Sequence, residues 1–148
     1  MKSVLIVGHG LAGAILAQTF HSRGIFAACF EGEIIHSASR VAAGLINPYI
    51  GPKLNIPKDF TKCIKSNRSF FTDFEKKHSC NLYSQDSLIR IFKSTSQRKL
   101  WDSLSTHNRQ NKFTERFISP ETLKKLNIEG RHGAGLTKIF RLEVNKFL

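Results

Sequence analysis

The sequence predicts an α/β fold that begins with a strand, a glycine-rich turn, a helix and a second strand. Residues 3–7, SVLIV, form a continuous apolar run, which is typical of a parallel strand buried on both faces. From Leu11 onward apolar residues recur every three to four positions, as in a helix, and Gly24 is a suitable residue to end it. Residues 25–31, IFAACFE, predict the second strand. Because a short connection through a helix makes the two strands parallel, this segment is predicted to be a βαβ unit.

The turn between the first strand and the helix has the pattern Gly-x-Gly-x-x-Gly. Gly8 permits a tight turn, Gly10 permits a phosphate to approach the backbone, and Gly13 permits the helix to pack closely on the strand. The first N–H groups of a helix have no partner within the helix and carry a partial positive charge, so they attract phosphate. The residues predicted to contact a phosphate are Gly8, His9, Gly10, Leu11, Ala12 and Gly13.

Glu31 lies at the end of the second predicted strand, about 20 residues after the glycines, where an acid accepts hydrogen bonds from a ribose. Such a glycine pattern alone also occurs as a purely structural turn. Its position between a strand and a helix, with Glu31 following, favours dinucleotide binding. A carboxylate would repel the 2′-phosphate of NADP, which leaves NAD and FAD as the candidates.

A second loop, residues 38–48 with the sequence ASRVAAGLINP, carries a resemblance to a known family. Together with VLIVGHGLAG, Gly24 and Glu31, it resembles the N-terminal part of the FAD-dependent oxidoreductases of the D-amino-acid oxidase and glycine oxidase family. The resemblance implies FAD as the cofactor, bound by a Rossmann-like unit. Small residues in the loop would leave room for a flat ring, and Ser39 and Arg40 would meet the pyrophosphate. The alternative is a tight loop whose small residues serve packing. The loop residues predicted to contact FAD are Ser39, Arg40, Ala42, Ala43, Gly44 and Leu45.

The resemblance also implies a division of the chain. Residues 1–50 would be the N-terminal part of the FAD-binding domain, and residues 51–148 a partial α+β substrate domain and the start of a return to the FAD domain. Because members of this family are much longer, the chain is expected to be truncated. The elements predicted from periodicity after residue 50 are a helix over 60–78, strands over 81–84 and 88–92, helices over 97–106 and 120–126, a strand over 135–142, and a helix beginning in the last residues.

The reaction that the resemblance implies is oxidation of the carbon–nitrogen bond of an amino acid or a secondary amine, with hydride transfer to the flavin. The partner would be a small-molecule amine or amino acid. The sequence nominates no catalytic residue. Two alternatives stay open: a tRNA-modifying flavoprotein that acts on an aminomethyl base, and a non-catalytic remnant that binds a nucleotide.

The composition of the chain bears on its partners, its location and its possible metal sites. The chain has 23 Lys and Arg against 11 Asp and Glu, a net charge of +12, which attracts phosphate-bearing molecules. The basic residues are scattered, so nucleic-acid binding is not favoured. Three widely spaced cysteines indicate a reducing, cytoplasmic location, and the six histidines lack the spacing of a helical metal pair. No apolar run approaches the roughly 20 residues of a membrane span, and nothing indicates an oligomeric state.

Overall fold

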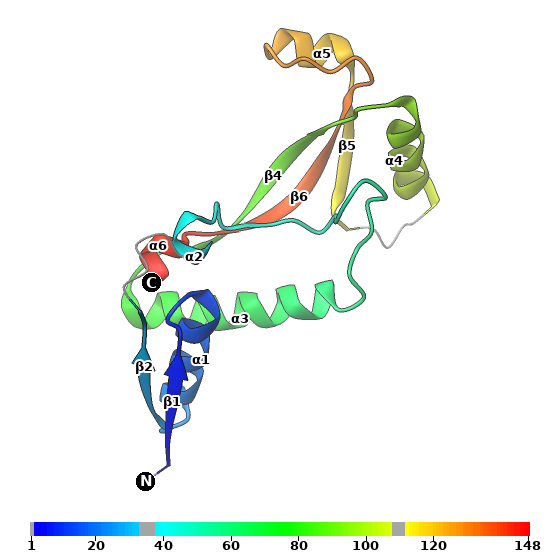
Figure 1. The fold of residues 1–148 in the computed structure, drawn as a ribbon. Helices are drawn as coiled ribbons and strands as arrows, with labels where there is room; N and C mark the ends of the chain where they lie inside the picture. The colour runs from blue at the N-terminus through cyan, green and yellow to red at the C-terminus, as the bar shows by residue number, and fades with distance from the viewer. Residues whose placement is uncertain (1, 33–37, 108–111) are drawn as a thin grey trace. The chain divides into compact units, whose positions relative to one another are not determined.

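The computed structural model of the chain describes residues 2–32, 38–107 and 112–148 as a mixed α/β structure (Figure 1). The chain divides into two compact units. One, the N-terminal unit, comprises Met1–Gly44 and Glu143–Leu148, and the other, the sheet unit, comprises Leu45–Leu142. The expected boundary followed residue 50, whereas the compact units divide after Gly44 and again after Leu142.

The N-terminal unit begins with the strand–helix–strand order that the sequence predicted. Strand β1 (Ser3–Val7) is followed by helix α1 (Leu11–Ser22) and strand β2 (Phe26–Phe30). The two strands are parallel, with Val7 paired to Phe30, which confirms the predicted βαβ unit. The short helices α2 (Ala38–Val41) and α6 (Val144–Phe147) contact each other within the same unit.

Only one face of the β1–β2 sheet is covered. Ile6 faces α1, because a methyl group at Gly13 of that helix would lie 3.4 Å from its Cγ2. The side chains of the opposite face stay in solvent, and Val7 and Phe30 are 83% and 70% exposed. Among the described residues, the apolar pattern typical of strands buried on both faces is therefore matched by a covering layer on one face only. A continuous apolar run does not reveal whether a second layer covers the sheet.

The sheet unit is built around one long strand, β6 (Ala134–Leu142), and all its strand pairs are antiparallel. Strand β4 (Tyr83–Ile91) pairs with β6 along its whole length. The short strand β3 (Leu45–Ile46) and strand β5 (Thr114–Ile118) pair with the two ends of β6. Figure 1 shows β6 between β4 and β5.

The strands of this unit differ from the prediction at two places. Strand β4 is continuous where two short strands, 81–84 and 88–92, were predicted, because the polar residues 85–87 between them also pair with β6. Strand β5 was not predicted. Its sequence, TERFI, is apolar only at its end, and a register shift between Thr114 and Arg116 interrupts the alternation that marks a strand.

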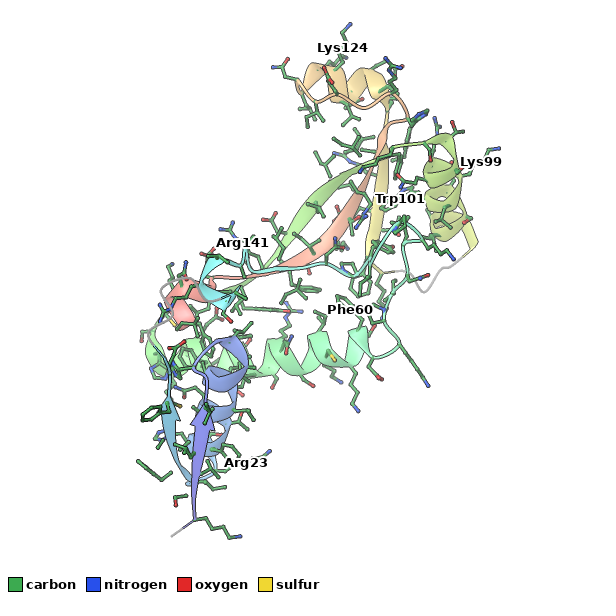
Figure 2. All side chains as sticks on the ribbon, viewed as in Figure 1. Arg23, Phe60, Lys99, Trp101, Lys124 and Arg141 are labelled. Atoms are coloured by element: carbon green, nitrogen blue, oxygen red, sulfur yellow. The ribbon has the colours of Figure 1, made fainter. Side chains whose placement is uncertain are left out.

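Three helices accompany the sheet, each within two residues of its predicted bounds: α3 (Phe60–His78), α4 (Thr95–His107) and α5 (Pro120–Lys125). Trp101 of α4 is 1% exposed and joins Tyr49, Leu54 and Phe92 in one apolar core (Figure 2). Leu123 of α5 is buried in a second core with Ile118 and Ala134. Among the described residues, no helix combines the length and the apolar character that crossing a membrane requires.

Helix α5 begins at Ser119, as its sequence predicted. The Ser119 Oγ accepts a hydrogen bond from the N–H of Thr122 at 3.2 Å, and Pro120 occupies the first helical position. The hydroxyl group of Ser119 also hydrogen-bonds Glu121 and thereby lowers the pKa of that carboxyl.

Ser119→Ala is expected to lower the free energy of unfolding by about 1 kcal/mol, because a first-turn N–H loses its acceptor. The pKa of Glu121 should rise toward its ordinary value at the same time. Chemical denaturation measures the first effect and NMR titration the second. Ser119→Asp, which restores an acceptor, is the matched control and should retain stability. An alanine variant that is as stable as the parent would contradict the assignment.

Candidate functional site

The glycine turn connects the carboxyl end of β1 to α1 and lies beside the carboxyl end of β2. Gly8 has a φ of +96°, a backbone conformation that side chains with a Cβ rarely adopt, so the tight turn needs glycine here. The N–H of Gly8 donates to the carbonyl of Phe30 at 2.7 Å. This bond continues the pairing of β1 with β2 by one residue and fixes the start of the turn beside the end of β2.

Gly13 lets the helix approach the turn more closely than any other residue would. A Cβ at this position would lie 1.9 Å from the carbonyl oxygen of Gly8 and 3.0 Å from its carbonyl carbon. Both are backbone atoms, so no side-chain rotation could relieve the overlap. The close packing predicted for this glycine is confirmed.

Gly10 makes room for a side chain from the second loop. The N–H of Leu11 donates to the Oγ of Ser39 at 3.0 Å, and a Cβ on Gly10 would lie 2.8 Å from the same oxygen. The structure thus brings the Ser39 side chain to the first residue of α1, a contact that was not predicted. No local pattern around Ser39 indicates this bond, because its partner is far away in the sequence. The contact of Ser39 with a pyrophosphate stays a prediction. The close approach of a phosphate to Gly10 stays a prediction.

The N-terminus of α1 retains free donors. Gly10 is the N-cap residue and provides no side chain, and the first turn contains no acidic residue. Among the described residues, the N–H groups of Ala12 and Gly13 have no hydrogen-bond partner. Unpartnered N–H groups at a helix N-terminus carry a partial positive charge, so the turn favours an anion.

Glu31 follows directly after Phe30, whose carbonyl accepts the hydrogen bond from Gly8. Glu31 is therefore the next residue along the chain from the one that hydrogen-bonds the turn. Glu31 itself is exposed. His9 within the turn is half-buried. The arrangement leaves a carboxylate next to the glycine turn and accessible from solvent.

The other residues of the second loop that were predicted to contact FAD lie in different parts of the structure. Arg40 follows Ser39 in α2 and is exposed, as are Ala42 and Ala43. Gly44 has a φ of +67°, which requires glycine for the turn out of the N-terminal unit. Leu45 belongs to the sheet unit, where it pairs with Arg141 in β6. The glycine turn belongs to the N-terminal unit.

No three His, Cys, Asp or Glu side chains of residues 2–32, 38–107 and 112–148 lie together as a possible metal-ligand set. Comparisons with protein-family models, with curated proteins and with solved structures each gave no match to this chain.

Proposed function

We propose that this chain binds FAD through a Rossmann-like N-terminal unit and is an FAD-dependent oxidoreductase acting on the carbon–nitrogen bond of an amino acid or a secondary amine. One observation carries the proposal. The turn Gly8–Gly13 connects a strand to a helix in a parallel βαβ unit, and Glu31 directly follows the strand that pairs with the first. This is the arrangement in which a diphosphate binds at a helix N-terminus and an acid binds the adjoining ribose.

The residues of the turn are suited to a diphosphate. Ala12 and Gly13 offer backbone donors, and the first turn contains no carboxylate that would repel an anion. Space is open on the side of Gly8 where a Cβ would stand: apart from its two chain neighbours, no described residue has a heavy atom within 4 Å. The donor of Leu11 is engaged by Ser39, which leaves the next two N–H groups for the ligand.

Each part of FAD has candidate residues in the N-terminal unit. The glycine turn would hold the diphosphate, and Glu31 would accept hydrogen bonds from the adenosine ribose. Ser39 orients the second loop against the turn through its bond to Leu11. The exposed small residues Ala42 and Ala43 would leave room for the flavin ring. When bound, FAD supplies the hydride acceptor, while the residues of this chain bind and orient the cofactor.

The binding experiment follows the quenching of flavin fluorescence as the protein is added to FAD. Glu31→Gln is expected to weaken FAD binding about tenfold, since a hydrogen bond to a charged acceptor contributes about 1.5 kcal/mol. Glu129→Gln makes the same change of charge at an exposed residue of the sheet unit and should leave the affinity unchanged. ADP, which contains the same adenosine and diphosphate, should compete with FAD. Absence of any FAD binding would overturn the proposal.

Reactivity is tested separately on the FAD-loaded protein. Anaerobic addition of N-methylglycine or of a D-amino acid should bleach the bound flavin, because reduction removes its visible colour. A protein that binds FAD with the expected effect of Glu31→Gln, but stays yellow with every amine offered, would be a nucleotide-binding protein without amine oxidation. That outcome would retain the binding proposal and reject the enzymatic one.

A further inference from the structure

The sheet unit contains a cavity of about 400 Å³ that is lined by four basic residues. Lys65 and Arg68 come from α3, Lys138 comes from the central strand β6, and Lys112 precedes β5. Three separate parts of the chain thus direct positive charge to one cavity.

The other lining residues of the cavity are partly polar and partly apolar. Thr61 and Gln85 add uncharged hydrogen-bonding groups, and Ile64, Phe113 and Phe140 form apolar walls. None of the described residues that line the cavity carries a carboxylate. Two other cavities of the sheet unit differ in charge: the one beside α5 includes Glu129 with its basic residues, and the one beside β5 has Arg116 as its single charged residue.

Among the described residues, the acidic side chains of the neighbouring elements form no ion pair with these four basic residues. Glu75 of α3 accepts hydrogen bonds from the backbone N–H groups of Leu82 and Tyr83. Glu115 of β5 accepts a hydrogen bond from Ser87 at 3.0 Å. Ser87 pairs with Lys138, so this carboxylate lies on the sheet face of Lys138 but forms no ion pair with it. Asp86 precedes Ser87 in β4 and so lies on the sheet face opposite to Gln85.

Within the described part of the chain, the side chains of Lys65, Arg68, Lys112 and Lys138 make no ion pair and no hydrogen bond. Four like charges around one cavity repel each other, and repulsion is stronger beside apolar walls than in bulk water. An anion between them would replace this repulsion with attraction, so binding is favoured by all four residues together.

Aromatic stacking holds the walls of the cavity in place. The ring of Tyr83 in β4 stacks on Phe71 of α3 and on Phe140 of β6, with centroid distances of 5.5 and 5.8 Å. Burial raises the pKa of Tyr83, and the charge of Arg68 acts in the opposite direction. Helix α3 is therefore anchored to the sheet beside the residues that line the cavity.

We propose that this cavity binds the phosphate group of a small phosphorylated ligand, at a site separate from the glycine turn. Phosphate carries close to two negative charges and accepts the paired hydrogen bonds that a guanidinium donates, while lysines act as point charges around it. The cavity volume is within the range of small-molecule sites. A small ligand is favoured over a nucleic acid because the basic residues surround one cavity and do not form a continuous stripe.

The experiment measures the binding of sodium pyrophosphate by isothermal titration calorimetry at constant ionic strength. Pyrophosphate is expected to bind, and the double variant Arg68→Gln/Lys138→Gln should weaken that binding at least tenfold. The matched control, Lys99→Gln/Lys124→Gln, removes the same charge from α4 and α5 (Figure 2) and should bind as the parent does. Circular dichroism of both variants checks that they fold.

Three outcomes would overturn the proposal. Equal weakening in both double variants would show attraction by net charge alone. Unchanged affinity in Arg68→Gln/Lys138→Gln would place the pyrophosphate elsewhere, including at the glycine turn. A short single-stranded RNA that binds more tightly than pyrophosphate, and whose affinity falls in both double variants, would indicate a nucleic-acid surface instead. Because the cavity and the glycine turn lie in different units, loss of FAD binding and loss of pyrophosphate binding are measured independently.

Discussion

Gly13→Ala is expected to destabilise the N-terminal unit by about 3 kcal/mol and to abolish FAD binding. The added methyl group would overlap the backbone carbonyl of Gly8, at 1.9 Å, so either α1 or the turn must move. Movement of α1 would also separate Leu11 from Ser39 and withdraw the N–H groups proposed to bind the diphosphate. Native-state hydrogen exchange of the amides of β1 and β2 measures the stability of this unit by itself.

The matched control for this prediction is Gly32→Ala. Gly32 lies close to the same strands, but a Cβ there would meet no heavy atom within 4 Å, so exchange and FAD affinity should change little. A Gly13→Ala protein whose β1 and β2 amides exchange as slowly as those of the parent would show that α1 does not pack against the turn as described. Stability retained together with lost FAD binding would separate the role of Gly13 in binding from its role in packing.

The local geometry at Gly8 and Gly13 could be predicted from the sequence because these two glycines act on atoms close to them along the chain. The tight turn at Gly8 and the close approach at Gly13 both involve residues 6–13. The bond from Leu11 to Ser39 could not be predicted, because it depends on how the second loop returns to the turn. A sequence pattern shows which residues can form a turn but not which distant side chain will reach it.

The same distinction holds for the fold and for the basic cavity. Helices α3, α4 and α5 have clear periodicity or a clear N-cap, and each was predicted from its own residues. Strand β5 forms through its pairing with β6. Because the register of that pairing shifts, the sequence of β5 does not show the regular alternation of apolar and polar residues. The four basic residues of the cavity come from three separate parts of the sequence, which are brought together by the packing of α3 on the sheet. Scattered positive charge therefore gave no indication of a local site.

The second large effect is expected at Gly135, in the core of the sheet unit. A Cβ there would lie 2.4–2.6 Å from three ring atoms of Trp101. This indole is 1% exposed and is held between Tyr49 and Phe92, with ring centroids 5.9 and 5.7 Å away. Because the indole has no free space to enter, Gly135→Ala should lower the free energy of unfolding by about 3 kcal/mol. Equilibrium denaturation followed by tryptophan fluorescence measures the loss.

A double-mutant cycle tests whether Gly135→Ala destabilises the protein through overlap with Trp101 or through another effect of alanine at position 135. Trp101→Leu alone should also be costly, at about 3 kcal/mol, because it leaves a cavity in the core. The smaller leucine leaves room for the alanine methyl group, so the double variant Gly135→Ala/Trp101→Leu should lose less than the sum of the two single losses. Since Trp101 is then absent, circular dichroism replaces fluorescence for all members of the cycle. Additive losses would mean that the indole and Gly135 are not in contact, and the core around α4 would have to be packed differently.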